Sequence, residues 1–310
     1  MNLIRYYNQN RKKIWGILII IFSAFILLQL VNTVYNINRQ QTIVTPTNDI
    51  KQGINTKTTQ LTDKRSVVTG EKIEDNQLES AITTINKFIS YCNEKEIQKA
   101  YELLTDKCKE QLYNTIEIFE QAYYNDIFNG EAKTCSVENW MNNTYKVKIM
   151  EDILSTGRNN NSYTKQDYIT VEKQGNEYKL NINNYVGSTN INKTTQTDNI
   201  SMKVINKNTY MEYEVYTIEV TNHTKSIMVL DSRTDVKSLY LEDRNGNQYP
   251  CYSHELIEPM LTVHQGETKQ ITIKFYSSYI TTKKIEAIVF SDVTLYDGQL
   301  SEGVKFKANI

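Results

Sequence analysis

The chain is poor in the residues that build compact metal and redox sites. Of its 310 residues only four are cysteine, three are histidine and two are tryptophan. The cysteines are Cys92, Cys108, Cys135 and Cys251. None of them has the C-x-x-C spacing of a zinc or redox motif. We therefore expect no metal and no other cofactor.

Two interpretations of the cysteines stay open. Cys92 and Cys108 fall on neighbouring predicted helices, so a disulfide between them is possible outside a membrane. The other interpretation treats all four as small buried apolar side chains, which free cysteines commonly are. The sequence favours buried thiols and leaves the bridge as the alternative.

The chain also lacks a basic cluster beyond its N-terminus. Residues 1–31 hold four basic and no acidic side chains, so the remaining 31 basic and 36 acidic groups give a formal charge of −5. A nucleic-acid-binding surface needs a concentration of Lys and Arg, which this acidic remainder does not offer. We expect no nucleic acid partner and no electrostatic docking onto anionic lipid.

Long apolar runs are absent except for one, at residues 14–31. Its 18 positions carry no charge and would span roughly 27 Å as a helix, close to the hydrocarbon thickness of a bilayer. The anchoring side chains of this run include Ile14, Trp15, Ile21, Phe25, Leu28 and Val31. We predict a single transmembrane helix, with the lipid bilayer as its partner.

The flanks of this run set its orientation. Arg11, Lys12 and Lys13 directly precede it, and no acidic residue does. By the positive-inside rule, residues 1–13 form a cytoplasmic tail and the rest of the chain lies outside the cytoplasm, at the plasma membrane. A cleaved signal peptide is the main alternative, but the run is long and lacks a small-x-small exit. A buried core helix is the third.

Composition divides the remainder into segments. Residues 32–77 are rich in Thr, Gln and Asn without apolar periodicity, which predicts a flexible tether. Residues 78–187 change from helical to strand periodicity and form a predicted α+β domain. A second polar stretch, residues 188–198, is predicted as a linker. Residues 199–310 contain only strand patterns and turns, which predicts a β-sandwich.

Three amphipathic helices are expected in the α+β domain. Apolar residues recur at steps of three and four from Leu78 to Ile89, and a second helix is centred on AYELLTDKCKEQL at 100–112. The third begins at Asn114, which with Glu117 resembles a capping box, and Gly130 marks its end.

Strands follow these helices. Tyr145, Val147 and Ile149 alternate with lysines, and residues 167–186 predict a hairpin that turns at 174–176. This order of three helices followed by a curved antiparallel sheet resembles the nuclear transport factor two-like superfamily, which includes ketosteroid isomerase, polyketide cyclases and subunits of type IV secretion. The resemblance covers about a third of the chain and implies a cone-shaped domain with an interior pocket.

The C-terminal strands carry a second resemblance. Val220-Thr221-Asn222 ends one strand, Leu241 to Tyr249 contains an Asn-Gly hairpin, and residues 263–267 read VHQGE. This pattern is similar to immunoglobulin-like domains on bacterial membrane-anchored proteins, although the Cys–Trp–Cys core of antibody domains is missing. In MEYEVYTIEV at 211–220 the alternation slips between Val215 and Tyr216, which predicts a bulge.

Candidate chemistry is sparse. The isomerase-like members of the superfamily use a buried carboxylate with a tyrosine, and the resemblance casts Asp126 and Tyr123 on the third helix as candidate ligand-binding residues. No motif fixes them, and no Ser/His/Asp or Cys/His set has supporting spacing. The segment DRNGN at 243–247 resembles part of a calcium loop, but a hairpin turn is the favoured interpretation.

The expected function is therefore interaction rather than catalysis. The sequence predicts a membrane-anchored, extracytoplasmic scaffold of a bacterial cell envelope that binds other envelope proteins or a second copy of itself. Its sharper form is a subunit of a conjugation or secretion assembly. The alternative is a small-molecule-binding or isomerase-like enzyme that uses the pocket of the α+β domain.

Overall fold

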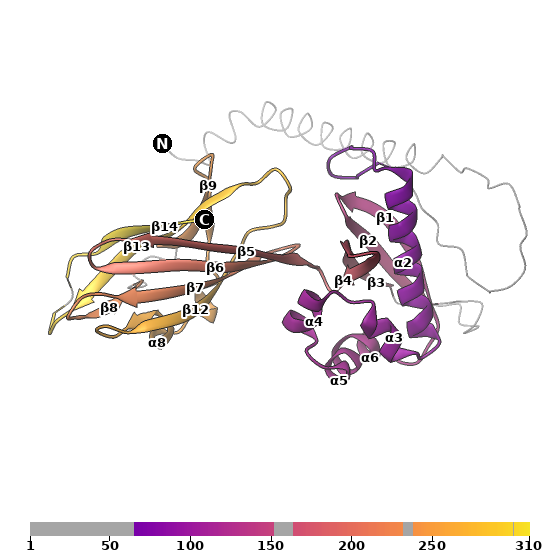
Figure 1. Cartoon of the computed structure of the whole chain (residues 1–310), viewed down its shortest axis with the longest axis horizontal. Helices are drawn as coiled ribbons and strands as arrows, with labels where there is room; N and C mark the ends of the chain where they lie inside the picture. Colours follow the sequence, from indigo (N-terminus) through magenta and orange to yellow (C-terminus); the bar gives the residue numbers. More distant parts are fainter. Residues whose placement is uncertain (1–64, 152–163, 232–237, 300) are drawn as a thin grey trace, which may run out of the picture. The chain divides into compact units, whose positions relative to one another are not determined.

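The computed structural model describes residues 65–151, 164–231, 238–299 and 301–310, all within the compact unit Thr56–Ile310. These residues form mostly β-sheet with a few helices (Figure 1). The predicted span at 14–31 and its basic flank lie outside them. Within the described ranges, no helix is both long enough and apolar enough to cross a membrane.

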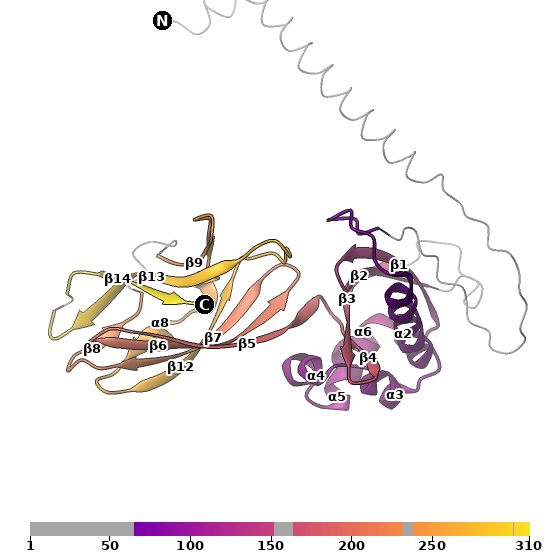
Figure 2. The same cartoon turned by 45° about the horizontal axis from the view of Figure 1, so that its top comes forward.

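The first helix confirms the predicted apolar stripe. Helix α2 (Asp75–Asn93) buries Leu78, Ala81, Ile85 and Phe88, which recur at steps of three and four residues. It lies along one face of the first sheet in both views (Figures 1 and 2). One helical face is buried there because the side chains of i, i+3 and i+4 share a face.

The end of the predicted tether is part of the fold. The tether was expected to reach residue 77, but α2 begins at Asp75. Upstream, the backbone N–H groups of Val67 and Val68 donate to the carbonyls of Asn139 and Trp140 at 3.0 and 3.2 Å. Residues 65–72 are therefore held by backbone hydrogen bonds, which leave no periodic pattern in their sequence.

The second predicted helix is two helices. Helix α3 (Ile97–Glu102) ends before Leu104, which pairs with Leu180 on the sheet. Helix α4 (Asp106–Leu112) then starts from Thr105, whose hydroxyl accepts from the Cys108 N–H at 2.9 Å. The break follows from Thr105, because an extended N-cap residue starts a new helix instead of continuing the old one.

The third predicted helix contains a π turn. It comprises α5 (Ile116–Phe119), the π-helical η1 (Glu120–Tyr124) and α6 (Asn125–Ile127). Its N-cap is Thr115 and not the expected Asn114, since the Thr115 hydroxyl accepts from the Ile118 N–H. The expected end is correct: Gly130 has a φ of 72°, which favours glycine.

The first sheet has the strand order β1-β2-β3-β4 and is antiparallel throughout. Its strands are β1 (Lys133–Met141), β2 (Thr144–Glu151), β3 (Thr164–Gln174) and β4 (Glu177–Asn181). The predicted alternation in β2 is confirmed, with Tyr145, Val147 and Ile149 buried. The β3–β4 turn at Gly175 is confirmed as well, whereas β1 was not predicted.

The predicted linker at 188–198 is wrong, because most of it is a strand. Strand β5 (Tyr185–Gln196) pairs along its length with β6 (Ile200–Tyr210), from Tyr185 opposite Tyr210 to Gln196 opposite Ser201. Most side chains of β5 are exposed or half-buried, so the strand shows no apolar alternation. Backbone pairing holds it in place, and a polar composition does not reveal that pairing.

The C-terminal half consists of two sheets. The first has the order β12-β7-β6-β5 and adds β7 (Glu214–Asn222) and β12 (Thr268–Phe275). The second contains β8 (Ile227–Val229), β9 (Leu239–Asp243), β10 (Gln248–Pro250), β11 (Thr262–Val263), β13 (Ile285–Tyr296) and β14 (Val304–Asn309). Two short helices, η2 (Ser253–Glu255) and α8 (Glu258–Leu261), connect strands.

One core joins these sheets. Met202, Ile218 and Ile273 from the first sheet belong to the same buried cluster as Leu241 and Phe290 from the second. Figure 2 shows β13 and β14 opposite β6, β7 and β12. The expected alternation of β12 is confirmed, since Ile271, Ile273 and Phe275 are all buried. Inward-facing residues of both sheets make the core, as in face-to-face packing generally.

The predicted bulge in β7 is wrong. Burial alternates without a break from Glu214 to Asn222, and the register shift lies in the partner strand, between Val204 and Asn206 of β6. The alternation of apolar residues in the sequence breaks because Glu214, a charged residue, occupies an inward position and is only 3% exposed. An inward glutamate therefore imitates a change of phase.

The segment 243–247 is a hairpin turn between β9 and β10, as favoured by the sequence. The Asp243 carboxylate accepts from the Asn245 and Asn247 N–H groups, the Asn247 side chain and the Tyr249 hydroxyl, each at 2.9 Å. These donors, the Asn247 side chain foremost, lower the pKa of the Asp243 carboxyl. The carboxylate thus accepts hydrogen bonds from groups of the turn itself.

This network predicts a pH-dependent stability. A depressed pKa contributes stability above the unfolded-state value of about 3.9, and that contribution is lost as the pH falls through the folded-state value. We expect Asp243→Asn to lower the thermal midpoint by several degrees at pH 7 and by progressively less below about pH 4. Scanning calorimetry across this pH range measures the difference. Asn245→Ala, in the same turn, is the control, and an Asp243→Asn deficit independent of pH would refute the assignment.

Candidate functional site

The two candidate residues of the third helix are separated by the fold. Tyr123 lies in η1, is 2% exposed, and donates its hydroxyl to Asp167 Oδ2 at 2.8 Å. Asp126, in α6, is exposed and pairs with Lys165 at 2.9 Å. The prediction that Tyr123 and Asp126 form one site is therefore wrong. The tyrosine's carboxylate partner is Asp167.

Tyr123 is buried together with its neighbour. Tyr123, Tyr124, Ile127 and Phe128 are all buried, and positions i, i+1, i+4 and i+5 share one face of a helix. The π-helical turn η1 contains the first two of these residues. The sequence pattern identified Tyr123 as an apolar-stripe residue but did not reveal the π-helical turn.

Asp167 is a buried carboxylate with three donors. It lies in β3, is 2% exposed, and accepts from Tyr123 and from the backbone N–H groups of Asn183 and Asn184 at 2.9 Å each. Burial raises the pKa of the Asp167 carboxyl, and these hydrogen bonds act against that rise. Burial also raises the pKa of Tyr123, which therefore stays a neutral donor.

This arrangement fixes the turn between β4 and β5. Asn183 and Asn184 have positive φ values of 57° and 63°, a conformation that asparagine tolerates better than most residues. Both Asp167 oxygens accept from groups of the protein, which ties the turn to the buried helix. The role that the described contacts support for Asp167 is structural.

One signal in the sequence could have found Asp167. It lies in phase with Ile169 and Val171 of β3, and all three are buried. A carboxylate on the apolar side of an alternating strand needs hydrogen-bond donors, because an unpaired buried charge is strongly destabilising. Which donors it finds depends on elements far along the chain, and no local pattern specifies them.

The space around Tyr123 is filled by aromatic rings. Its ring stacks on Phe119 with centroids 5.8 Å apart, and Phe88 and Tyr113 approach it at 5.9 and 6.1 Å. All four side chains are at most 2% exposed. Offset and tilted contacts at these distances are favourable packing geometries. The interior position expected for a ligand is thus occupied by the protein's own side chains.

Cys92 and Cys108 are free thiols in the described structure, so the possible bridge between them is not formed. Both side chains are at most 1% exposed. Burial raises the pKa of Cys92, and it raises the pKa of Cys108 to about 12. A buried thiol with a raised pKa is a poor nucleophile and metal ligand. Among the described residues no group of three His, Cys, Asp or Glu side chains could hold a metal ion.

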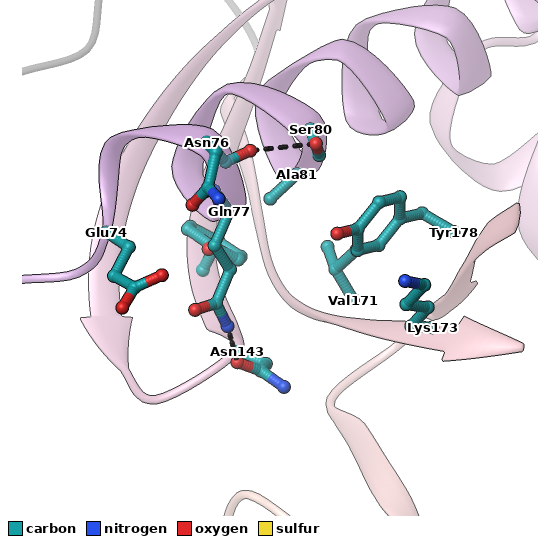
Figure 3. A pocket seen from close by; sticks show the side chains of 10 residues that line it. Glu74, Asn76, Gln77, Ser80, Ala81, Asn143, Val171, Lys173 and Tyr178 are labelled. Atoms are coloured by element: carbon teal, nitrogen blue, oxygen red, sulfur yellow. Dashed lines mark hydrogen bonds between the residues drawn. The ribbon is translucent and has the colours of Figure 1, made fainter. Parts of the chain in front are cut away.

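A hollow of about 450 Å³ lies elsewhere, between the first turn of α2 and the sheet. Figure 3 shows Glu74 on one side and Lys173 with Tyr178 across from it. Gln77 Nε2 donates to Asn143 Oδ1 at 2.6 Å, which joins the helix to the β1–β2 turn. The lining residues are Glu74, Asn76, Gln77, Ser80, Ala81, Asn143, Tyr145, Val171, Lys173 and Tyr178. No pattern in the sequence points to this place.

Comparison with known proteins adds little. No family model and no curated protein matches the chain. A solved structure of a conserved hypothetical protein from Bacillus anthracis is similar at 14% identity, with a TM-score of 0.24, over 37% of this chain and 95% of that one. A similarity of this size carries no functional argument.

Proposed function

We propose that this chain is a membrane-anchored interaction protein of a bacterial cell envelope. Residues 14–31 hold it in the plasma membrane, residues 1–13 lie in the cytoplasm, and the folded part lies outside. Support for the location comes from the uncharged run behind Arg11, Lys12 and Lys13. The proposed partners are other envelope proteins or a second copy of the chain, and a conjugation or secretion assembly is the sharper form.

The observation that carries the interaction role is the filled interior of the α+β half. A catalytic pocket needs space for a substrate beside its reactive groups. Here Phe88, Tyr113 and Phe119 surround Tyr123. The packed interior supports a scaffold whose outer surfaces do the binding.

The alternative of an isomerase-like enzyme has one observation in its favour, the buried Tyr123–Asp167 pair. Three protein donors already engage this carboxylate, and a general base must reach the proton that it removes. We therefore keep the pair as a structural element. The alternative would need a substrate to displace side chains that are almost fully buried.

The finer fold assignments belong to the same proposal. A long helix across an antiparallel sheet supports a nuclear transport factor two-like domain in the α+β half. Two sheets around one core support an immunoglobulin-like sandwich in the C-terminal half. The shared β5–β6 hairpin replaces the linker that the sequence suggested between them.

Cysteine labelling tests the location. Ile257 is 57% exposed, so Ile257→Cys is expected to react with a membrane-impermeant maleimide in intact cells. Asn8→Cys, in the N-terminal tail, should react only after the cells are permeabilised. Wild-type protein, in which three of the four thiols are buried, gives the background. Protection of Ile257→Cys in intact cells would contradict the proposal.

Removal of residues 1–31 tests the anchor, since the shortened chain should leave the membrane fraction. In-cell photo-crosslinking from exposed positions, with identification of the captured protein, tests the interaction role. Capture of one defined envelope protein, or of a second copy, supports it. Turnover of a small molecule without any captured partner would favour the enzyme alternative.

A further inference from the structure

Another hollow, of about 470 Å³, differs from the one at α2 because most of its lining side chains are apolar or aromatic. Trp140, Tyr168 and Tyr279 contribute three aromatic rings. Val68 and Ile280 also line it and are 46% and 48% exposed. Sites for small molecules have volumes of roughly 300–1,000 Å³ and are lined mainly by side chains of these kinds. The hollow therefore suits a ligand with apolar groups.

Backbone hydrogen bonds join three of the segments that line this hollow. The Met211 N–H donates to the Asn184 carbonyl, and the Tyr279 N–H donates to the Met211 carbonyl, both at 2.9 Å. Trp140 of β1 and Tyr168 of β3 meet edge to face, with ring centroids 5.3 Å apart. The fold itself thus holds the aromatic walls in place.

The charge on these walls is negative. Among the described residues that line the hollow, only Glu212 carries a charged side chain. It is exposed, and no described cation pairs with it. Burial raises the pKa of Tyr168, and the charges of Glu138 and Glu212 raise it further, so both carboxylates act on this ring.

Aromatic rings beside a carboxylate favour an organic cation. The faces of Trp and Tyr rings attract cations within about 6 Å of the ring centroid, and quaternary ammonium ligands are recognised in this way. Trp140 already attracts one cation, since Lys146 Nζ lies 5.3 Å from its centroid, but Lys146 does not line the hollow. Glu212 would repel an anion, and a neutral apolar molecule would gain nothing from its charge.

We propose that this hollow binds a methylated ammonium group such as that of choline, with the rings of Trp140, Tyr168 and Tyr279 against its methyl groups and Glu212 beside its charge. Free choline compounds and choline lipid headgroups share this chemistry. The site requires neither the membrane anchor nor an envelope protein. Failure of the location experiments would therefore leave it standing, and its own failure would leave the proposed function standing.

The test is a titration of the full chain, purified in dodecyl maltoside and followed by the fluorescence of Trp140. Trp15→Phe removes the other tryptophan. The probes are choline and tetramethylammonium chloride, with sodium chloride as the control for ionic strength. The matched neutral probe is the alcohol in which a tert-butyl group replaces the trimethylammonium of choline. Choline should bind saturably and about fivefold more tightly than this alcohol, the ratio for about 1 kcal/mol of cation–π attraction.

Variants locate the binding. Tyr168→Leu should weaken choline binding by about fivefold, and Tyr279→Leu provides a second ring variant. Glu212→Gln should weaken it by about threefold, the effect of an exposed charge pair. Glu219→Gln and Tyr296→Leu, which remove an acid and an exposed tyrosine outside the hollow, should bind normally. Thermal midpoints close to that of the wild type show that the variants fold.

Vesicles separate the two sources of the ligand. In phosphatidylglycerol vesicles the chain should respond to added choline. Loss of this response in phosphatidylcholine vesicles identifies the lipid headgroup as the occupant, and its persistence identifies a free molecule; both support the site. No saturable response to choline or tetramethylammonium, equal binding of the neutral alcohol, or binding unaffected by both Tyr168→Leu and Tyr279→Leu would each overturn the proposal.

Discussion

Replacing Asp167 with alanine is expected to lower the free energy of unfolding by about 3–5 kcal/mol, since each buried donor left without an acceptor costs roughly 1–3 kcal/mol. The donors are the Tyr123 hydroxyl and the N–H groups of Asn183 and Asn184. None of them can turn to solvent while the π turn and the β4–β5 connection keep their places. Urea unfolding followed by circular dichroism measures the loss.

The matched control is Asp126, the carboxylate that the sequence paired with Tyr123. Its ion pair with Lys165 is well exposed, with side chains 55% and 36% accessible, and exposed pairs contribute at most about 1 kcal/mol. Asp126→Ala should therefore change stability little. Asp167→Asn, which retains one acceptor oxygen but adds a donor, should fall between the two. Equal losses for Asp126→Ala and Asp167→Ala would refute the structural role of Asp167.

The second large effect is expected at Glu214, the inward glutamate of β7. Its carboxylate accepts from the Ser277 and Tyr216 hydroxyls at 3.0 and 3.2 Å and lies 3.5 Å from Lys207 Nζ. Ser277 in turn accepts from Lys283 Nζ at 2.5 Å. The network is buried at its centre, because Ser277 and Tyr216 are 0% exposed.

Glu214→Ala is expected to lower the free energy of unfolding by about 3 kcal/mol, because removal of one partner leaves the others buried without it. Burial already lowers the pKa of Lys283, with the Glu214 charge acting against that shift. Loss of the carboxylate should thus lower it further. Thermal unfolding measures the stability change.

Glu219→Ala is the control for this position. Glu219 lies in the same strand, β7, but on its half-exposed side, so its removal should cost much less than that of Glu214. Glu214→Gln, which keeps an acceptor without the charge, should be intermediate. Similar midpoints for Glu214→Ala and Glu219→Ala would show that the network does not stabilise the sheet.

The elements that the sequence predicted well are those with one buried face. In α2 the packing of Leu78, Ala81, Ile85 and Phe88 against the sheet requires apolar residues at helical spacing. In β2 and β12 the same requirement produces alternation. Burial of a single face requires apolar residues at the period of that helix or strand. The period can therefore be recognised without knowing which element covers the face.

Elements without such a face were missed. Strand β5 is exposed or half-buried over most of its length, so its place depends on backbone pairing with β6. The break at Thr105 follows the pairing of Leu104 with Leu180 on the sheet. The π turn at Glu120–Tyr124 carries Tyr123, which donates to Asp167 of β3. The ordered segment before α2 was assigned to the tether for the same reason.

Only one residue of the buried Tyr123–Asp167 pair was identified from the sequence. Tyr123 was identified, but its partner lies 44 residues away instead of three. The resemblance cast Asp126 in this role on the same predicted helix as Tyr123, whereas the carboxylate that Tyr123 contacts is Asp167 of strand β3. The hollow at α2 combines residues from one helix and three strands, and no local pattern brings them together.

The β5–β6 hairpin also bears on how this architecture can be inherited. Tyr185 and Tyr210 at one end belong to the buried cluster of the α+β half, while Met202 and Val204 belong to that of the C-terminal half. A recombination event between residues 188 and 198 would sever a ladder on which both clusters depend. We therefore expect the two halves to be exchanged between genes together, unlike domains joined by an unstructured linker.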